Sequence, residues 1–142
     1  MVIIDTHTHI YLPEFDTDRP SMLQRARQAG VQWMLLPAID SSVTAAMLQL
    51  EASSPACRCM MGLHPCSVKE NYQEELRLAQ AWLGKRPFIA IGEIGLDFYW
   101  DKTFTTQQYE ALHQQLEWAL QYNLPVSIHS RNATDECIQV VS

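Results

Sequence analysis

The chain opens with an apolar run that passes directly into a His-x-His pair: Met1-Val2-Ile3-Ile4-Asp5-Thr6-His7-Thr8-His9. Such a run is typical of a buried parallel strand, which delivers functional side chains at its carboxyl end. Because strand side chains alternate between faces, Asp5, His7 and His9 point the same way, with the histidine Cα atoms about 6.6 Å apart. Two imidazoles at that separation can close on one metal ion, or can simply share a polar strand end.

Four further apolar runs follow the first, with helix-like segments between them. We predict strands at residues 2–5, 33–36, 60–63, 88–91 and 126–128. We predict helices at residues 20–29, 42–52, 73–83 and 106–122, and a fifth beginning near residue 133, where the chain stops inside the element. This alternation predicts right-handed βαβ units and a parallel sheet, an α/β fold with residues 1–142 in a single domain.

The fourth predicted helix has the clearest local signals. Thr105 and Gln108 form a capping-box pattern at its start, and Asn123 suits a left-handed cap at its end. An apolar stripe runs along one face and comprises Tyr109, Leu112, Leu116 and Leu120. His113 falls beside this stripe, and we interpret it as a packing or border residue rather than a ligand.

Composition excludes several classes of protein. The 142 residues are 47% hydrophobic, enough to bury a core, and carry a net charge of −6. No apolar stretch reaches the roughly 18 residues of a membrane span and no signal-peptide pattern begins the chain, so we expect a cytoplasmic protein without a membrane partner. Lysines and arginines are scattered, which disfavours nonspecific nucleic-acid binding. Without Cys-x-x-Cys spacing, we interpret the cysteines as reduced thiols: Cys57, Cys59, Cys66 and Cys137.

Polar residues also follow the later predicted strands. His64, Glu93 and His129 come after the third, fourth and fifth strands, and α/β folds place their sites at these carboxyl ends. Glu93 is flanked by Gly92 and Gly95, which permit close backbone approach, and its carboxylate can bridge two divalent ions. Each of the three residues also has a plain interpretation as a polar strand-end side chain.

Several neighbours of these residues have two interpretations. Arg131 offers a planar fork for a phosphate or carboxylate, or is a solvated loop residue. Asp5 can fix the tautomer of an imidazole, or make an ordinary interior contact. A run after Glu93 can line a substrate pocket or pack its own loop: Asp97, Tyr99 and Trp100.

Four motifs occur together in order: Asp5-Thr6-His7-Thr8-His9, Gly62-Leu63-His64-Pro65, Gly92-Glu93-Ile94-Gly95-Leu96-Asp97 and His129-Ser130-Arg131. With them the chain resembles the TatD family of metal-dependent hydrolases, which are amidohydrolase-like (β/α)8 barrels. The resemblance implies a partial TIM barrel of about five parallel strands, truncated in the fifth helix, because a complete barrel needs about 200 to 250 residues or more. It also implies a hydrolase that cleaves phosphodiester bonds by two-metal water activation, typically a deoxyribonuclease.

The resemblance implies a role for each motif residue. His7 and His9 would hold one divalent ion, His129 the second, and the catalytic Glu93 would bridge them, with magnesium, zinc or manganese as the metal. His64 and Arg131 would contact the phosphate of DNA or another phosphodiester substrate.

The chain also departs from the family pattern. Asn132 stands where the family commonly has an aspartate, and it suits a helix cap. The family's later histidine and aspartate ligands have no counterpart in these residues, so we expect incomplete activity.

Two alternatives remain open. The first is an amidohydrolase acting on C–N or lactone bonds, although several such barrels bridge their metals with a modified lysine where this chain has Glu93. The second is an inactive, truncated half-barrel that self-associates through its exposed first and fifth strands.

Overall fold

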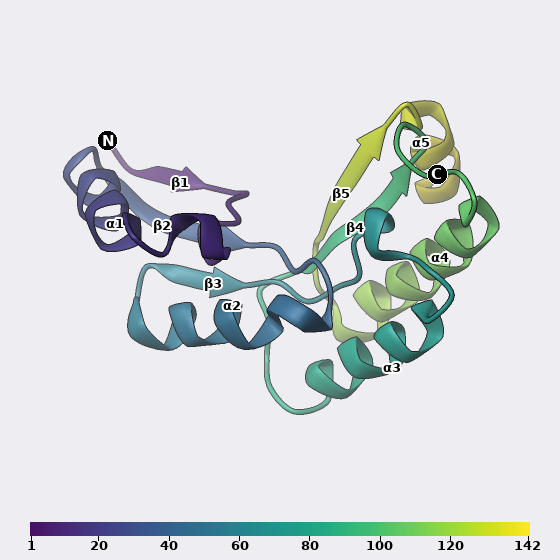
Figure 1. The fold of residues 1–142 in the computed structure, drawn as a ribbon, viewed down its shortest axis with the longest axis horizontal. Coiled ribbons are helices and arrows are strands. Elements are labelled where there is room, and N and C mark those ends of the chain that lie inside the picture. Colours follow the sequence, from purple (N-terminus) through teal and green to yellow (C-terminus); the bar gives the residue numbers. More distant parts are fainter.

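The computed structural model describes residues 1–142 and contains five strands in two hydrogen-bonded groups (Figure 1). The first sheet has the order β1-β2-β3 and the second pairs β4 with β5, and every pairing is parallel. An isolated bridge between Met61 and Ile91 joins the two groups, and the Gly92 N–H donates to the Met61 carbonyl at 3.0 Å. The strands are β1 (Ile3–Asp5), β2 (Val31–Leu36), β3 (Cys57–Cys59), β4 (Ile91–Asp97) and β5 (Val126–Arg131).

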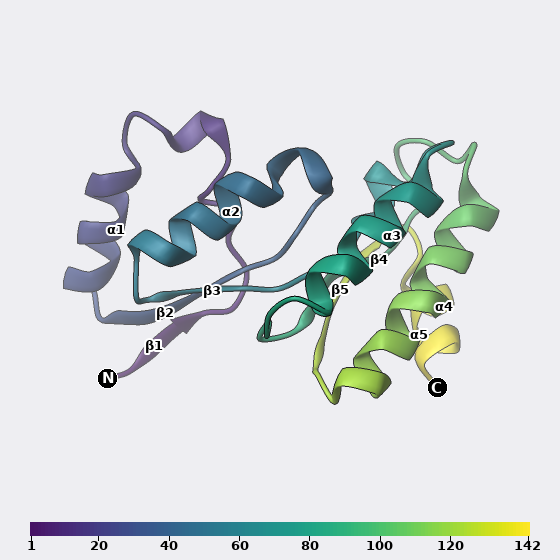
Figure 2. The same ribbon diagram turned by 90° about the horizontal axis from the view of Figure 1, so that it is seen from below.

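Helices alternate with the strands along the chain, as predicted. In Figure 2 the first two α-helices accompany the first sheet and the other three accompany the second. The α-helices are α1 (Arg19–Gln28), α2 (Ser41–Ser53), α3 (Tyr72–Leu83), α4 (Thr105–Tyr122) and α5 (Thr134–Val141), and two short 3-10 turns are η1 (Pro13–Phe15) and η2 (Pro65–Ser67). The protein therefore has a mixed α/β fold with parallel strands and five α-helices.

The strand boundaries correct the sequence-based expectation. The third strand ends at Cys59, before residues 60–63, and the fourth begins at Ile91 and continues to Asp97. A Cβ at Gly95, whose φ is +145°, would lie 1.9 Å from the carbonyl oxygen of His129. The glycine therefore does not end the strand; it lets β5 approach closely enough to pair with β4. As a result, Glu93 and His129 lie within strands rather than after them.

The start of α4 also differs from the prediction. The N-cap is Phe104 with no side-chain hydrogen bond, and Gln108 is 2% exposed instead of closing a capping box. The Gln108 amide accepts from the Asp97 N–H at 2.8 Å and donates to the Asp97 carbonyl at 3.1 Å. Gln115 makes the same pair of bonds with Leu63, at 2.6 and 3.2 Å. Two buried amides thus satisfy backbone groups next to the carboxyl ends of the strands.

Other end signals of the predicted helices have mixed outcomes. Asn123 adopts the left-handed conformation, with φ 52°, as expected. Leu120 is 83% exposed, so the predicted apolar stripe does not extend to it. Asn132 also has φ 52°, and the N-cap of α5 is Ala133, so the predicted cap at Asn132 is wrong.

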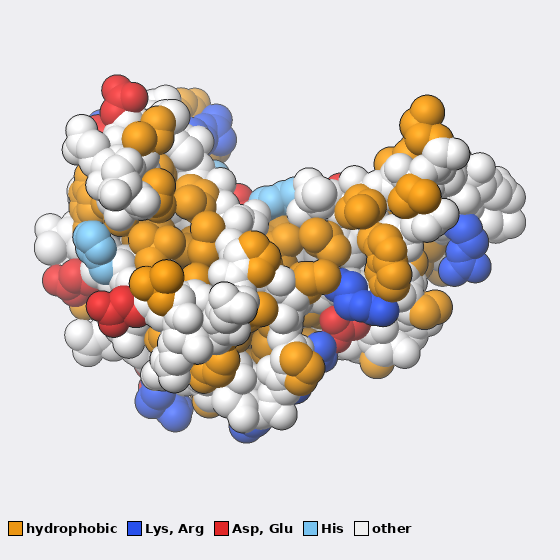
Figure 3. Space-filling model, turned by 180° about the vertical axis from the view of Figure 1, so that it is seen from behind, with side chains coloured by type: hydrophobic (Ala, Val, Ile, Leu, Met, Phe, Trp, Pro, Cys, Tyr) orange, Lys and Arg blue, Asp and Glu red, His pale blue; other side chains and the backbone are white.

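Apolar side chains are exposed on the two edge strands. Ile4 of β1 is 50% exposed, and Val126 and Ile128 of β5 are each 37% exposed. Figure 3 shows apolar side chains gathered on the side of the molecule that faces away in Figure 1. All four cysteines are free, as expected for reduced thiols. No helix combines the length and apolar character needed to cross a membrane.

Candidate metal centre

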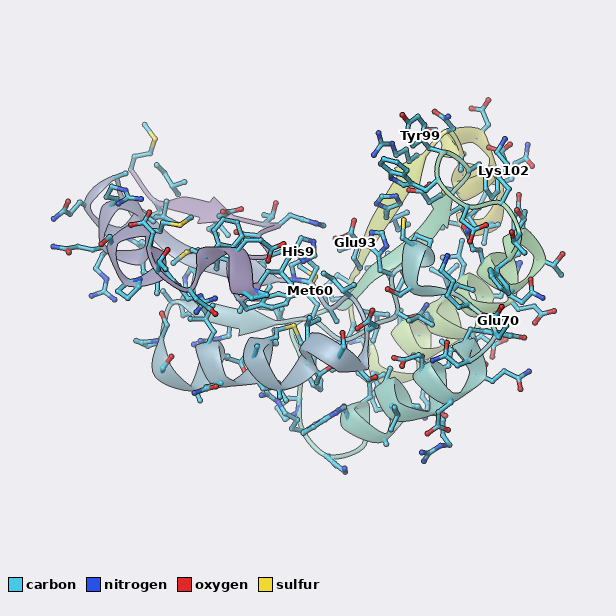
Figure 4. All side chains as sticks on the ribbon, in the orientation of Figure 1. His9, Met60, Glu70, Glu93, Tyr99 and Lys102 are labelled. Atoms are coloured by element: carbon cyan, nitrogen blue, oxygen red, sulfur yellow. The ribbon has the colours of Figure 1, made fainter.

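The buried carboxylate of Glu93 lies between the two sheets and is surrounded by imidazoles. Its Oε2 is 3.0 Å from Nε2 of His7 and 3.1 Å from Nε2 of His9. Its Oε1 is 3.1 Å from Nδ1 of His129 and 3.8 Å from Nε2 of His64. In Figure 4, His9 and Glu93 face one another across the gap between the sheets. Four histidines from three segments of the chain therefore meet at one carboxylate, as the strand pattern predicted.

Glu93 is ionised in this setting. Burial alone would raise the pKa of its carboxyl, but hydrogen bonds with His129 and His9 outweigh burial and lower the pKa well below its usual range. The carboxylate offers two oxygens, each facing a different set of imidazole nitrogens. It can therefore contribute one oxygen to each of two cations.

The tautomer of His9 follows from its second neighbour, Tyr11. The Tyr11 hydroxyl donates to the Pro37 carbonyl at 2.6 Å, so its oxygen is left to accept from Nδ1 of His9 at 3.1 Å. A neutral His9 with its proton on Nδ1 has a bare lone pair on Nε2. That lone pair faces the ionised Oε2 of Glu93, an arrangement that needs a proton or a cation between the two atoms. The donor set of imidazole nitrogen and carboxylate oxygen fits a divalent metal ion.

His129 has the equivalent arrangement with Asp97. Its Nε2 lies 2.8 Å from Oδ2 of Asp97, whose pKa is lowered to about 2 because hydrogen bonds, the first from the Trp100 N–H, outweigh the effect of burial. An ionised carboxylate can only accept, so Nε2 of His129 carries a proton. Hydrogen bonds with Glu93 and Asp97 raise the pKa of His129, so Nδ1 also donates to Glu93 when the ring is protonated, and a divalent ion would take the place of that proton. A carboxylate that orients an imidazole in this way is typical of metal sites.

His64 has the opposite tautomer. Its Nδ1 accepts from the Cys66 N–H at 3.0 Å, which places the proton of the neutral ring on Nε2, toward Glu93. Burial, the largest cause, lowers the pKa of His64 to about 4, so the ring is neutral near pH 7. Burial also raises the pKa of the Cys66 thiol to about 11, and that thiol donates to Asp97 at 3.3 Å. His64, Cys66 and His129 lie close enough to hold an ion, but these protons make His64 and Cys66 donors.

The remaining candidate residues make no hydrogen bond or ion pair with Glu93. Asp5 accepts the backbone N–H of His7 at 3.2 Å and does not bond to an imidazole. Arg131 makes no ion pair with Glu93, and its guanidinium carbon lies 4.0 Å from the centre of the Tyr99 ring. His113 is exposed on α4 and has no role in the cluster.

Sequence reasoning missed Tyr11 and did not recognise the supporting role of Asp97. Tyr11 follows His7 and His9 at the same two-residue spacing, although it lies in a turn, and this spacing was the available signal for it. Asp97 was assigned to a loop, but it is the last residue of β4 and is only 2% exposed. Strand parity from Glu93 would have placed Asp97 on the same side as Glu93.

Known proteins resemble this chain over almost its whole length. The metal-dependent hydrolase YjjV of Escherichia coli (strain K12), whose name marks it as uncharacterized, is 38% identical over 94% of this chain and 52% of its own length. The crystal structure of that TatD homologue superposes with a TM-score of 0.89, at 37% identity, over 96% of this chain and 54% of the other. The 3'-5' ssDNA/RNA exonuclease TatD of Pantoea ananatis is 30% identical over 98% of this chain and 54% of its own length.

The chain thus spans about half the length of the curated relatives that it matches. The family model described as "TatD related DNase" matches residues 4–142. The chain belongs to the TatD family of related DNases.

Proposed function

We propose that this chain contributes the greater part of a metal-dependent phosphodiester hydrolase site. The observation that carries the proposal is that Nε2 of His9 and Nδ1 of His129 lie 3.1 Å from opposite oxygens of the ionised Glu93. Neutral imidazoles held in these tautomers by Tyr11 and Asp97 are set up to share cations with the carboxylate.

The proposed ligand set follows from these contacts. His7 and His9 would hold one divalent ion, His129 would hold the other, and Glu93 would supply an oxygen to each. Magnesium, zinc and manganese are the candidate metals, and nitrogen ligands favour the last two over magnesium. When bound, a pair of divalent ions lowers the pKa of a water and stabilises the charge on the departing oxygen.

The other residues of the site act on the substrate in this proposal. The Nε2–H of His64 points toward the Glu93 side of the site and can donate to a phosphate oxygen. Arg131 supplies a second donor for phosphate at the carboxyl end of β5. The substrate class is DNA or another phosphodiester, which agrees with the name of the exonuclease relative from Pantoea ananatis.

We propose further that residues 1–142 form the N-terminal part of one (β/α)8-barrel domain. The support is the parallel order of the five strands and the superposition on about half of the YjjV chain. The exposed apolar residues on β1 and β5 fit the same proposal, because barrel strands are covered on both sides. Left uncovered, these edges make the chain self-associate as its concentration rises.

Metal binding by the 142-residue chain tests the proposal. In a calorimetric titration with Mn²⁺, Glu93→Gln should weaken binding by more than about 100-fold, because even outer-shell partners contribute about 10- to 100-fold. The matched control is Glu74→Gln, since Glu74 is exposed on α3 and pairs only with Arg77.

Hydrolysis gives the second measurement. We expect metal-dependent release of nucleotides from a DNA oligonucleotide, absent in Glu93→Gln, and no turnover of cyclic amides. Equal Mn²⁺ affinity in the wild-type chain and Glu93→Gln would refute the bridging role, and hydrolysis of cyclic amides alone would favour the amidohydrolase alternative.

A further inference from the structure

An exposed aromatic cluster lies beside the candidate metal centre, immediately beyond β4. The Tyr99 and Trp100 rings meet edge to face with centroids 4.7 Å apart, and they are 51% and 66% exposed. The guanidinium of Arg131 lies 4.0 Å from the Tyr99 ring and 5.2 Å from the Trp100 ring. Figure 4 shows Tyr99 beyond Glu93, toward the carboxyl ends of β4 and β5. Two aromatic rings and one cation thus form a single surface at this end of the strands.

This surface is held in place by the same carboxylate that orients His129. Oδ1 of Asp97 accepts the backbone N–H groups of Tyr99 and Trp100 at 3.0 and 3.1 Å, while its Oδ2 receives His129. The Phe98 N–H donates to the Arg131 carbonyl at 2.9 Å. The position of the rings relative to the candidate metal centre is therefore set by hydrogen bonds within the two strand ends.

Packing of the loop does not account for the two exposed rings. Phe98 packs against the hydrophobic core, whereas Tyr99 and Trp100 are not part of that contact. Phe98 contacts the core, and the next two aromatic side chains are each more than half exposed. Exposed aromatic rings beside a cation are the elements with which proteins stack unpaired nucleobases.

We propose that Tyr99, Trp100 and Arg131 form a stacking surface for an unpaired base of single-stranded nucleic acid, whose phosphate then reaches the metal centre. The inference rests on the proposed phosphodiester hydrolase function and adds the residues that recognise the unpaired base. Bases within a duplex have both faces covered by stacking, so the surface selects an unpaired base. The net charge of −6 gives little general attraction for phosphates, so a contact that does not depend on charge contributes most of the recognition.

The test is binding of a fluorescent, single-stranded thymidine oligonucleotide to the 142-residue chain in EDTA, followed by anisotropy. Trp100→Ala should weaken binding by about 5- to 150-fold, the range observed for one stacked base, and Tyr99→Ala should also weaken it. The matched control is Trp33→Ala, because Trp33 is 38% exposed beneath Arg58 at 4.5 Å but lies on β2.

Two further arms sharpen the experiment. The ratio of the wild-type and Trp100→Ala affinities should stay constant between about 50 and about 200 mM salt, since stacking releases no counterions. An oligonucleotide with abasic sites has no bases to stack. Its affinity for the wild-type chain should therefore be no higher than the affinity of the unmodified oligonucleotide for Trp100→Ala. Unchanged affinity in Trp100→Ala, or equal wild-type affinity for single strand and duplex, would overturn the proposal.

Mn²⁺ titration of the wild-type chain separates this proposal from the metal site. Base-dependent binding in EDTA without any Mn²⁺ binding would leave the stacking surface standing and refute the proposed hydrolase. Mn²⁺ binding by the wild-type chain, with equal oligonucleotide affinity in the wild-type chain and Trp100→Ala, would refute the stacking surface and leave the metal site standing.

Discussion

The two sheets contribute to the candidate metal centre in different ways. The first sheet supplies His7 and His9 from the segment after β1, where the His7 side chain is 40% exposed. The second supplies Glu93 and His129 from within paired strands, where the Glu93 side chain is 7% exposed. Residues inside a strand ladder are positioned by backbone pairing, whereas residues beyond a strand depend on side-chain contacts. The second sheet is therefore the preorganised half of the site.

The largest effect is expected in the second sheet, where β5 approaches β4 closely at Gly95. Gly95→Ala places a Cβ 1.9 Å from the carbonyl oxygen of His129 at a φ of +145°. Strain and overpacking together should lower the free energy of unfolding by about 4 kcal/mol in urea denaturation. The control is Gly84→Ala, where φ is −75° and the nearest atom is 3.7 Å away, with an expected change within about 0.5 kcal/mol. Equal stabilities of the two variants would show that β4 and β5 are not so closely paired.

Asp97→Asn tests how the second half orients its imidazole. The amide removes the charged acceptor for Nε2 of His129 while keeping the shape of the side chain. Affinity for Mn²⁺ should fall by about 10- to 100-fold in calorimetry, as for other outer-shell carboxylates. An unchanged affinity would mean that Asp97 serves only the backbone of Tyr99 and Trp100.

Tyr11→Phe is the corresponding change in the first half. It removes the acceptor for Nδ1 of His9, a neutral phenol oxygen rather than a carboxylate. Because neutral hydrogen bonds are weaker than charge-assisted ones, Mn²⁺ affinity should fall by about 10-fold, less than in Asp97→Asn. A larger loss in Tyr11→Phe than in Asp97→Asn would reverse the ranking of the two halves.

The smallest effect concerns the contact between the first sheet's helix and the turn η2. Asp40 caps α2 by accepting the Ser42 N–H at 3.0 Å, and it accepts the Ser67 hydroxyl at 2.7 Å. Asp40→Ala should cost about 1 kcal/mol at pH 7. Burial would raise the pKa of Asp40, but hydrogen bonds from Ser42 and Ser67 lower it.

A depressed folded pKa fixes the sign of the pH dependence. The contribution of Asp40 is complete above its unfolded pKa of about 4 and is lost as the pH falls through the lower folded value. Thermal unfolding of the wild-type chain and Asp40→Ala should therefore converge in acid. A gap that widens in acid would contradict the assignment.

Position along the strands explains which parts of the site were predictable. Glu93 follows the apolar run of the fourth strand, which placed it near the carboxyl end, although the predicted strand end was wrong and a register irregularity between Ile91 and Ile94 interrupts strict alternation. The same reasoning brought together His7, His9 and His129 from segments far apart in the sequence. Their convergence needed only parallel strands whose carboxyl ends meet.

The supporting contacts were less predictable because they depend on tertiary packing. Gln108 fits a capping-box pattern in the sequence. In the structure its amide instead forms hydrogen bonds with the backbone N–H and carbonyl of Asp97. Glycine is common at strand ends, so the sequence suggests that the strand stops near Gly95. The structure places Gly95 inside the strand, because β5 approaches too closely for a larger residue. Competition between local and tertiary hydrogen bonds decides such positions, and a single sequence does not reveal its outcome.

In the proposed site, Tyr11 and Asp97 each hold a proton on one nitrogen of a histidine ring. The other nitrogens, Nε2 of His9 and Nδ1 of His129, then face the cations on Glu93. Nitrogen NMR of the imidazoles during a Zn²⁺ titration at neutral pH tests this arrangement most directly. We predict that those two nitrogens shift on Zn²⁺ addition while Nδ1 of His9 and Nε2 of His129 keep their protons. A Zn²⁺ shift at Nε2 of His129, or no shift at either histidine, would contradict the account.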